Sequence, residues 1–137
     1  MRNTELHALS SYRMQKAKDC LATAQSLVET DPATSLNRSY YAVFHAMRAV
    51  MALDERDFKK HSALISYFRQ AYIKPGLFPT SCSKTIEDLF RIRQKSDYED
   101  FYLISRAEVE KQANNAALFI EAIETYLAAQ STKPEND

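Results

Sequence analysis

The scarcity of helix-breaking residues is the feature that most limits how this chain can fold. Its 137 residues include one glycine and four prolines, namely Gly76, Pro32, Pro75, Pro79 and Pro134. The stretches between them are rich in alanine, leucine, glutamate, lysine and glutamine, which favour helix formation. No segment shows the alternation of apolar and polar residues that is typical of a strand. The sequence therefore predicts an all-α fold.

Apolar residues recur at steps of three and four in five segments, and each segment predicts an amphipathic helix. Asp31 is expected to cap the second helix, with Pro32 at its first helical position. Ser105 and Glu108 form a capping box before the last helix. The expected helices cover about residues 4–29 or 10–29, 32–54, 62–73, 84–94 and 105–129, with a loop over 96–103.

Length, charge and cysteine content narrow the class of protein. We expect one domain over residues 1–130 and a disordered polar tail over 131–137. Eighteen basic and eighteen acidic residues cancel, so any site for a polyanion must be a local patch. The two cysteines and three histidines lack metal-ligand spacing, so we expect no metal and no cofactor. The sequence predicts neither a signal peptide nor a membrane span, and we expect a cytoplasmic protein.

One candidate site lies on the second helix. Arg38, Tyr41, His45 and Arg48 follow one another at steps of three, four and three residues. At about 100° per residue they share a sector of roughly 80°. Two interpretations stay open: a polar shoulder whose side chains bond to neighbouring helices, or a cleft in which Arg38 and His45 bind a phosphate or a base.

A second candidate lies at the end of the fourth helix and comprises Arg91, Arg93, Lys95, Asp97 and Tyr98. Cations in a last helical turn complement the helix dipole, so capping alone could explain them. Asp97 is then a partner of Arg93, and Tyr98 fills the core below the loop. Alternatively, a guanidinium, a carboxylate and a phenol close together would hold a phosphodiester. The connector Lys59-Lys60-His61 is interpreted as solvated.

Three motifs resemble the HEPN (higher eukaryotes and prokaryotes nucleotide-binding) superfamily, in particular its small stand-alone prokaryotic members. They are residues 37–46 (NRSYYAVFHA), 60–62 (KHS) and 93–98 (RQKSDY), and they occur in the family's order and at similar spacing. The resemblance covers essentially the whole chain. It implies an up-and-down bundle of four or five helices that is commonly a homodimer. It also implies a minimal nucleotidyltransferase as partner, in a toxin–antitoxin or defence pair.

Many members of that superfamily are metal-independent ribonucleases in which an arginine is followed four to six residues later by a histidine. In such enzymes the arginine would hold the phosphate and the histidine would move the proton of the 2′-hydroxyl. This chain departs from the pattern because Tyr98 stands at the histidine position after Arg93, and no histidine follows. A phenol is a poor general base at neutral pH. Arg38 and His45 have a six-residue gap, but within one helix.

The resulting hypothesis is an RNA- or nucleotide-binding HEPN protein that acts as a toxin-like endoribonuclease. The alternative is a non-catalytic binding or adaptor module for a nucleotide or a protein partner. The expected catalytic residues are His45, Arg93 and Tyr98. The residues expected to bind phosphate or nucleotide are Arg38, Tyr41, Arg93 and Asp97.

Overall fold

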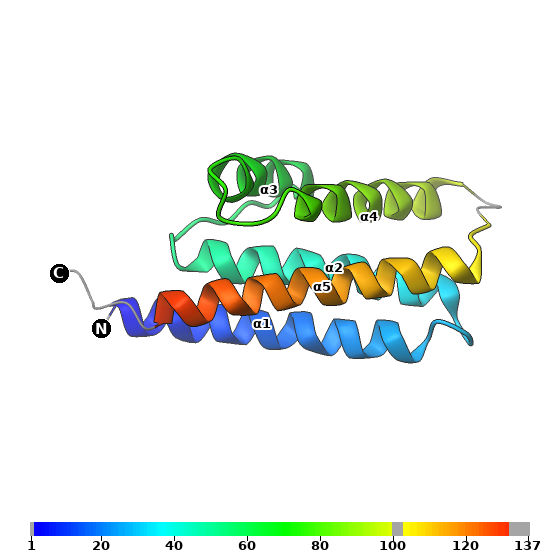
Figure 1. The fold of residues 1–137 in the computed structure, drawn as a ribbon, viewed down its shortest axis with the longest axis horizontal. Coiled ribbons are helices and arrows are strands. Elements are labelled where there is room, and N and C mark those ends of the chain that lie inside the picture. Colours follow the sequence, from blue (N-terminus) through cyan, green and yellow to red (C-terminus); the bar gives the residue numbers. More distant parts are fainter. Residues whose placement is uncertain (1, 100–102, 132–137) are drawn as a thin grey trace.

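The computed structural model, which describes residues 2–99 and 103–131, is an all-α bundle (Figure 1). Four long helices run up and down along one direction, and the short α3 (His61–Phe68) with the π-helical turn η1 (Arg69–Ile73) lies beside α4 (Ser81–Tyr98). The predicted all-α bundle is therefore confirmed. Within the described residues, no helix is both long and apolar enough to cross a membrane. The elements are α1 (Arg2–Ser26), α2 (Pro32–Ala52), α3 (His61–Phe68), η1 (Arg69–Ile73), α4 (Ser81–Tyr98) and α5 (Arg106–Ser131).

Helix α2 is the central element, and it packs against α1, α4 and α5. It begins as predicted, because the Asp31 carboxylate accepts the Thr34 N–H at 3.2 Å and Pro32 takes the first helical position. Every residue from 35 to 52 is buried or half-buried. Polar side chains on this helix are therefore held at fixed positions by their neighbours.

Small residues let α1 and α2 approach closely. Ala17 and Ala24 on α1, and Ala42 and Ala49 on α2, have no exposed surface. At one end of this contact the Ser10 hydroxyl donates a hydrogen bond to the Ala49 carbonyl. At the other end the Ser35 hydroxyl donates to the Ala24 carbonyl, and both bonds measure 2.7 Å. The two bonds set an antiparallel register that places the polar residues of α1 beside those of α2.

Several predicted helix boundaries differ from the structure. Helix α1 ends at Ser26 and not at about 29, α2 ends at Ala52 and not at about 54, and α4 begins at Ser81 and not at about 84. Helix α4 continues to Tyr98, so residues 96–98 are helical rather than loop. An ion pair between Arg93 and Asp97, four residues apart, supports this extra turn. Helix α5 extends to Ser131, past its predicted end at 129 and one residue into the predicted tail. The serine part of its predicted capping box is present, since the Glu108 N–H donates to the Ser105 hydroxyl. Residues 100–102 and the rest of the tail, 132–137, lie outside the described residues.

Candidate phosphate-binding site

Tyr41 lies at the centre of a cluster formed by α2 and α4. Arg93 on α4 donates an N–H to the Tyr41 hydroxyl at 3.2 Å, and its guanidinium carbon is 5.5 Å from the ring centroid. The guanidinium carbon of Arg38 is 5.3 Å from the same centroid, a cation–π distance. The His45 ring centroid lies 6.0 Å from it. Four of the residues predicted for the site thus meet at one aromatic ring.

The remaining predicted residues divide into two groups. Asp97 joins the cluster, because its Oδ2 is 3.7 Å from Arg93 Nε. Tyr98 is 85% exposed, so it does not fill the core, and among the described residues it makes none of the ring contacts around Tyr41. Arg91 pairs with Asp88 at 3.4 Å instead of with the cluster. Lys95 is exposed.

His61 belongs to this cluster, although sequence reasoning assigned it to a solvated connector. Its Nδ1 is 2.8 Å from the Tyr40 hydroxyl, and its ring centroid is 4.2 Å from that of Phe44. It also lies 6.1 Å from the Tyr41 ring. Burial is the main factor that raises the pKa of Tyr40 to about 12, so the Tyr40 hydroxyl stays protonated. His61 lies in the family-like segment at residues 60–62, and this is the sequence feature that could have identified it as a site residue.

His45 sits in a positive and poorly hydrated environment. Burial is the main cause that lowers the pKa of its imidazole to about 4, and the charges of Lys16, Arg48, Arg38 and Arg13 lower it further. The ring is therefore neutral at pH 7. These four cations come from two helices, and only one carboxylate, Asp57, is paired with any of them among the described residues.

Helix α1 supplies one side of this positive region, a contribution that the sequence did not reveal. Arg13 donates to the Arg48 carbonyl at 3.2 Å, and the Arg38 guanidinium lies 3.9 Å from the Cys20 sulfur. The spacing of Arg13, Lys16 and Cys20 puts all three on one face of α1. Spacing along a single helix cannot say which face of another helix will lie beside it.

Two nitrogens in the cluster are buried without a hydrogen-bond partner among the described residues. They are His45 Nδ1 and Arg93 Nε. Buried polar atoms are normally satisfied, so each such atom calls for an explanation. Arg93 Nε has the Asp97 carboxylate 3.7 Å away. Phosphate oxygens would accept hydrogen bonds from the guanidinium N–H groups of Arg38 and Arg93, and they would compensate the surrounding positive charge.

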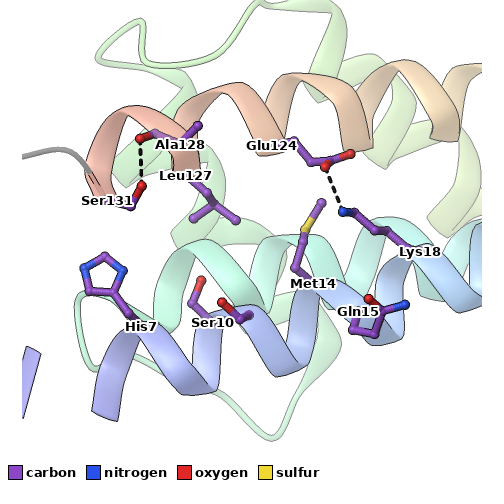
Figure 2. A pocket seen from close by; sticks show the side chains of 10 residues that line it. His7, Ser10, Met14, Gln15, Lys18, Glu124, Leu127, Ala128 and Ser131 are labelled. Carbon is purple, nitrogen blue, oxygen red and sulfur yellow. Dashed lines mark hydrogen bonds and ion pairs between the residues drawn. The ribbon is translucent and has the colours of Figure 1, made fainter. Parts of the chain in front are cut away.

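A cavity of about 350 Å³ between α1 and α5 offers a contrast (Figure 2). His7, Ser10 and Ser131 line it, but its charged residues, Lys18 and Glu124, already pair with each other at 2.8 Å. This cavity therefore has no uncompensated charge with which to attract a phosphate. No group of three or more potential metal ligands occurs within residues 2–99 and 103–131.

The protein is a small up-and-down helical bundle. Arginines and histidines gather around aromatic rings of its central helix and form a cationic, aromatic site. Residues 10–126 match the HEPN domain family, and the chain belongs to that family. The match includes α2, α3, α4 and nearly all of α5, so every residue of the Tyr41 cluster falls within it.

The curated relatives that the chain matches are similar to it in length. A UPF0332 protein of Thermotoga maritima is 27% identical over 121 residues, which is 88% of this chain and 92% of the relative. A protein of Methanocaldococcus jannaschii named "Putative toxin MJ0142" is 25% identical over 126 residues, or 90% of this chain and 86% of the relative. A second protein of that organism, "Putative toxin MJ0605", is 26% identical over 112 residues, or 81% and 83%.

Proposed function

We propose that this chain is a toxin-type HEPN protein that binds RNA through a phosphate at the Tyr41 cluster and cleaves the strand without a metal ion. The observation that carries the proposal is the meeting of Arg38, His45 and Arg93 at the Tyr41 ring. The names of two relatives from Methanocaldococcus jannaschii support the toxin assignment.

In the proposed reaction the 2′-hydroxyl of one nucleotide attacks the adjacent phosphate, and the 5′-oxygen leaves. Arg93 and Arg38 hold the phosphate oxygens, because a guanidinium fork matches their geometry. His45, neutral at pH 7, accepts the proton of the 2′-hydroxyl. His61, in the neutral tautomer whose Nδ1 accepts the Tyr40 hydroxyl, donates a hydrogen bond from Nε2 to a phosphate oxygen, and the leaving 5′-oxygen takes its proton from water.

The low pKa of His45 makes binding and catalysis interdependent. With four cations nearby, the free imidazole is a weak base. A bound phosphate brings negative charge next to these cations, which raises the pKa of His45 toward neutrality and makes it a better proton acceptor. His45 is thus expected to become an effective base only when RNA is in place.

A second candidate function is a binding or adaptor module without catalysis. Its supporting observation is the solvent-exposed Tyr98 at the position where the family's ribonucleases have histidine, since this leaves the site without the usual acid–base group. The arginines would then hold a nucleotide or RNA phosphate that is not cleaved.

Cleavage assays in the presence of a chelator distinguish the two candidates. His45→Ala should lower the cleavage rate by roughly 10²- to 10⁴-fold, as general acid–base groups do. Arg93→Ala should weaken both RNA binding and turnover. The matched control is His7→Ala, which removes a histidine of α1 that lines the other cavity and should leave the rate unchanged. If folded wild-type protein cleaves no RNA tested, the binding-module candidate is favoured.

We further propose a homodimer and a minimal nucleotidyltransferase partner. Leu9 and Tyr12 on α1 are 39% and 60% exposed, and their spacing places them on the side of α1 that carries Lys16. Burying these side chains against a second copy would stabilise a dimer. Sedimentation should show a dimer at micromolar concentration, and Leu9→Glu should shift it toward monomer.

Co-expression with a minimal nucleotidyltransferase from the same source genome, followed by co-purification, tests the proposed nucleotidyltransferase partner.

A further inference from the structure

We propose that a cavity beside the Tyr41 cluster binds an unpaired nucleobase of the same RNA strand, next to the phosphate held by Arg93. This inference rests on the proposed RNA binding. The cavity has a volume of about 460 Å³ and lies between α2 and the segment that leads into α3. It is lined by Phe44, Arg48, Asp57, Phe58 and Lys59.

Aromatic residues place this base cavity directly against the proposed reaction site. The Phe44 ring centroid is 4.2 Å from that of His61 and 5.8 Å from that of His45. Phe58 forms another part of the wall, and its ring is supported from behind by Tyr67, at 5.3 Å between centroids. Single-stranded RNA bases characteristically pack on aromatic side chains held in this way.

The charges of the base cavity favour an anionic strand. Asp57 accepts from Arg48 at 3.2 and 2.8 Å, from Arg13 at 3.3 Å and from the Phe58 N–H at 2.9 Å. Its two oxygens have about four acceptor positions, so the carboxylate is occupied by the protein. Asp57 therefore fixes Arg48 at the wall. The exposed Lys59 adds a further positive charge at the rim.

The length of the positive region indicates a strand longer than one nucleotide. Arg38 and Arg48 are ten residues apart on α2, which corresponds to about 15 Å along the helix axis. Asp57 holds the Arg48 guanidinium and the Asn37 amide oxygen holds that of Arg38, so the two arginines offer separate positions for phosphates. A strand that places one phosphate between Arg38 and Arg93 can extend toward Arg48 and present its neighbouring base to Phe58, with the largely buried Phe44 forming the wall beside it.

A double-mutant cycle between the protein and the RNA tests the base cavity. The probes are 2′-O-methyl hexanucleotides, which cannot be cleaved by 2′-hydroxyl attack, each with one abasic position, and binding is followed by fluorescence anisotropy. One abasic position should weaken binding to wild-type protein about 5- to 100-fold, the range of stacking on one aromatic side chain. Phe58→Ala should weaken binding of the intact probe to a similar extent. This variant should then bind the intact and the abasic probes with equal affinity. Leu77→Ala, which removes a half-exposed apolar side chain outside the cavity, should behave as wild type.

The outcomes separate this inference from the proposed function. If Phe58→Ala binds the intact probe as tightly as wild type while Arg93→Ala does not, the base cavity is wrong and phosphate binding at the cluster stands. If no probe binds to wild-type protein, both are wrong. If Phe58→Ala shifts the monomer–dimer equilibrium and leaves the abasic effect in place, the cavity receives a second copy of the chain instead. Phe58→Leu, which keeps an apolar side chain but no ring, replaces the alanine variant if that variant does not fold.

Discussion

At the scale of single residues, Tyr41 joins two groups that are far apart in the sequence. It lies 52 positions from Arg93, yet its hydroxyl accepts a hydrogen bond from that arginine. Its ring contacts Arg38 on one side and lies close to His45 and His61. The hydroxyl therefore orients a guanidinium, and the ring keeps the other cationic and basic groups at short distance.

Tyr41→Phe should weaken RNA binding about fivefold. The substitution removes only the acceptor for Arg93, a loss on the order of 1 kcal/mol for one hydrogen bond, and it keeps the ring and its packing. Anisotropy titrations with a non-cleavable RNA measure the effect. Tyr12→Phe makes the same chemical change on an exposed tyrosine of α1 and should leave the affinity unaltered. Equal affinities for wild type and Tyr41→Phe would show that the hydroxyl does not position Arg93 for RNA.

His45 should make the fold less stable in mild acid. Its pKa is about 4 in the folded chain and 6.5 as the ordinary value, so below pH 6.5 the unfolded chain binds a proton that the folded chain does not. The unfolding free energy should therefore fall as the pH drops from 6.5 toward 4. Burial lowers the pKa of His61 as well, and it adds to the same trend.

Urea titrations between pH 4.5 and 7 measure this dependence. His45→Gln should show a weaker decrease of the unfolding free energy with acid, whereas His7→Gln should match wild type. A site-resolved NMR titration of the imidazole provides an independent check, and binding of a non-cleavable RNA should raise the observed pKa of His45. A pKa of 6.5 or higher in the free protein would contradict the positive, buried environment described for this ring.

At the scale of the helices, sequence reasoning succeeded where local chemistry decides the outcome. Asp31 and Pro32 mark the start of α2 correctly, because capping and a fixed φ act within one turn. The end of α4 was predicted too early, since its last turn contains no buried apolar residue and is supported by the Arg93–Asp97 pair. Leu9 follows the apolar periodicity of α1 but is 39% exposed, because periodicity does not fix how far the neighbouring helix extends.

The close α1–α2 contact should be sensitive to volume. Ala17→Leu adds three carbons at a position with no exposed surface, and overpacking of this kind typically costs about 1–3 kcal/mol of unfolding free energy. The same change at Ala8, an exposed residue of the same helix, should alter stability little. Chemical denaturation of both variants tests this. If Ala17→Leu is as stable as Ala8→Leu, the two helices have room that the structure does not show.

At the scale of the whole molecule, folding creates a charge distribution that the composition conceals. Basic and acidic residues are equal in number, but the packing of three helices gathers cations from α1, α2 and α4 around His45 and Tyr41. The sequence predicted Arg38, Tyr41 and His45 from their spacing on one helix, and Arg93 from the charged residues at the end of another. It did not predict Arg13, Lys16, Tyr40 or His61, whose proximity depends on the register of the α1–α2 contact and on the entry to α3.

The salt dependence of RNA binding should report this local concentration of charge. For a single strand, the logarithm of the affinity falls with the logarithm of the salt concentration by about 0.7 for each phosphate that the protein neutralises. Contact with two or three phosphates therefore predicts a slope of about −1.4 to −2.1. Arg93→Ala should reduce the slope by about 0.7 because one phosphate contact is lost. Lys111→Ala removes the same charge from an exposed position on α5, and its slope should equal that of wild type. If the two variants reduce the slope equally, RNA is attracted by the protein's diffuse charge and not by the Tyr41 cluster.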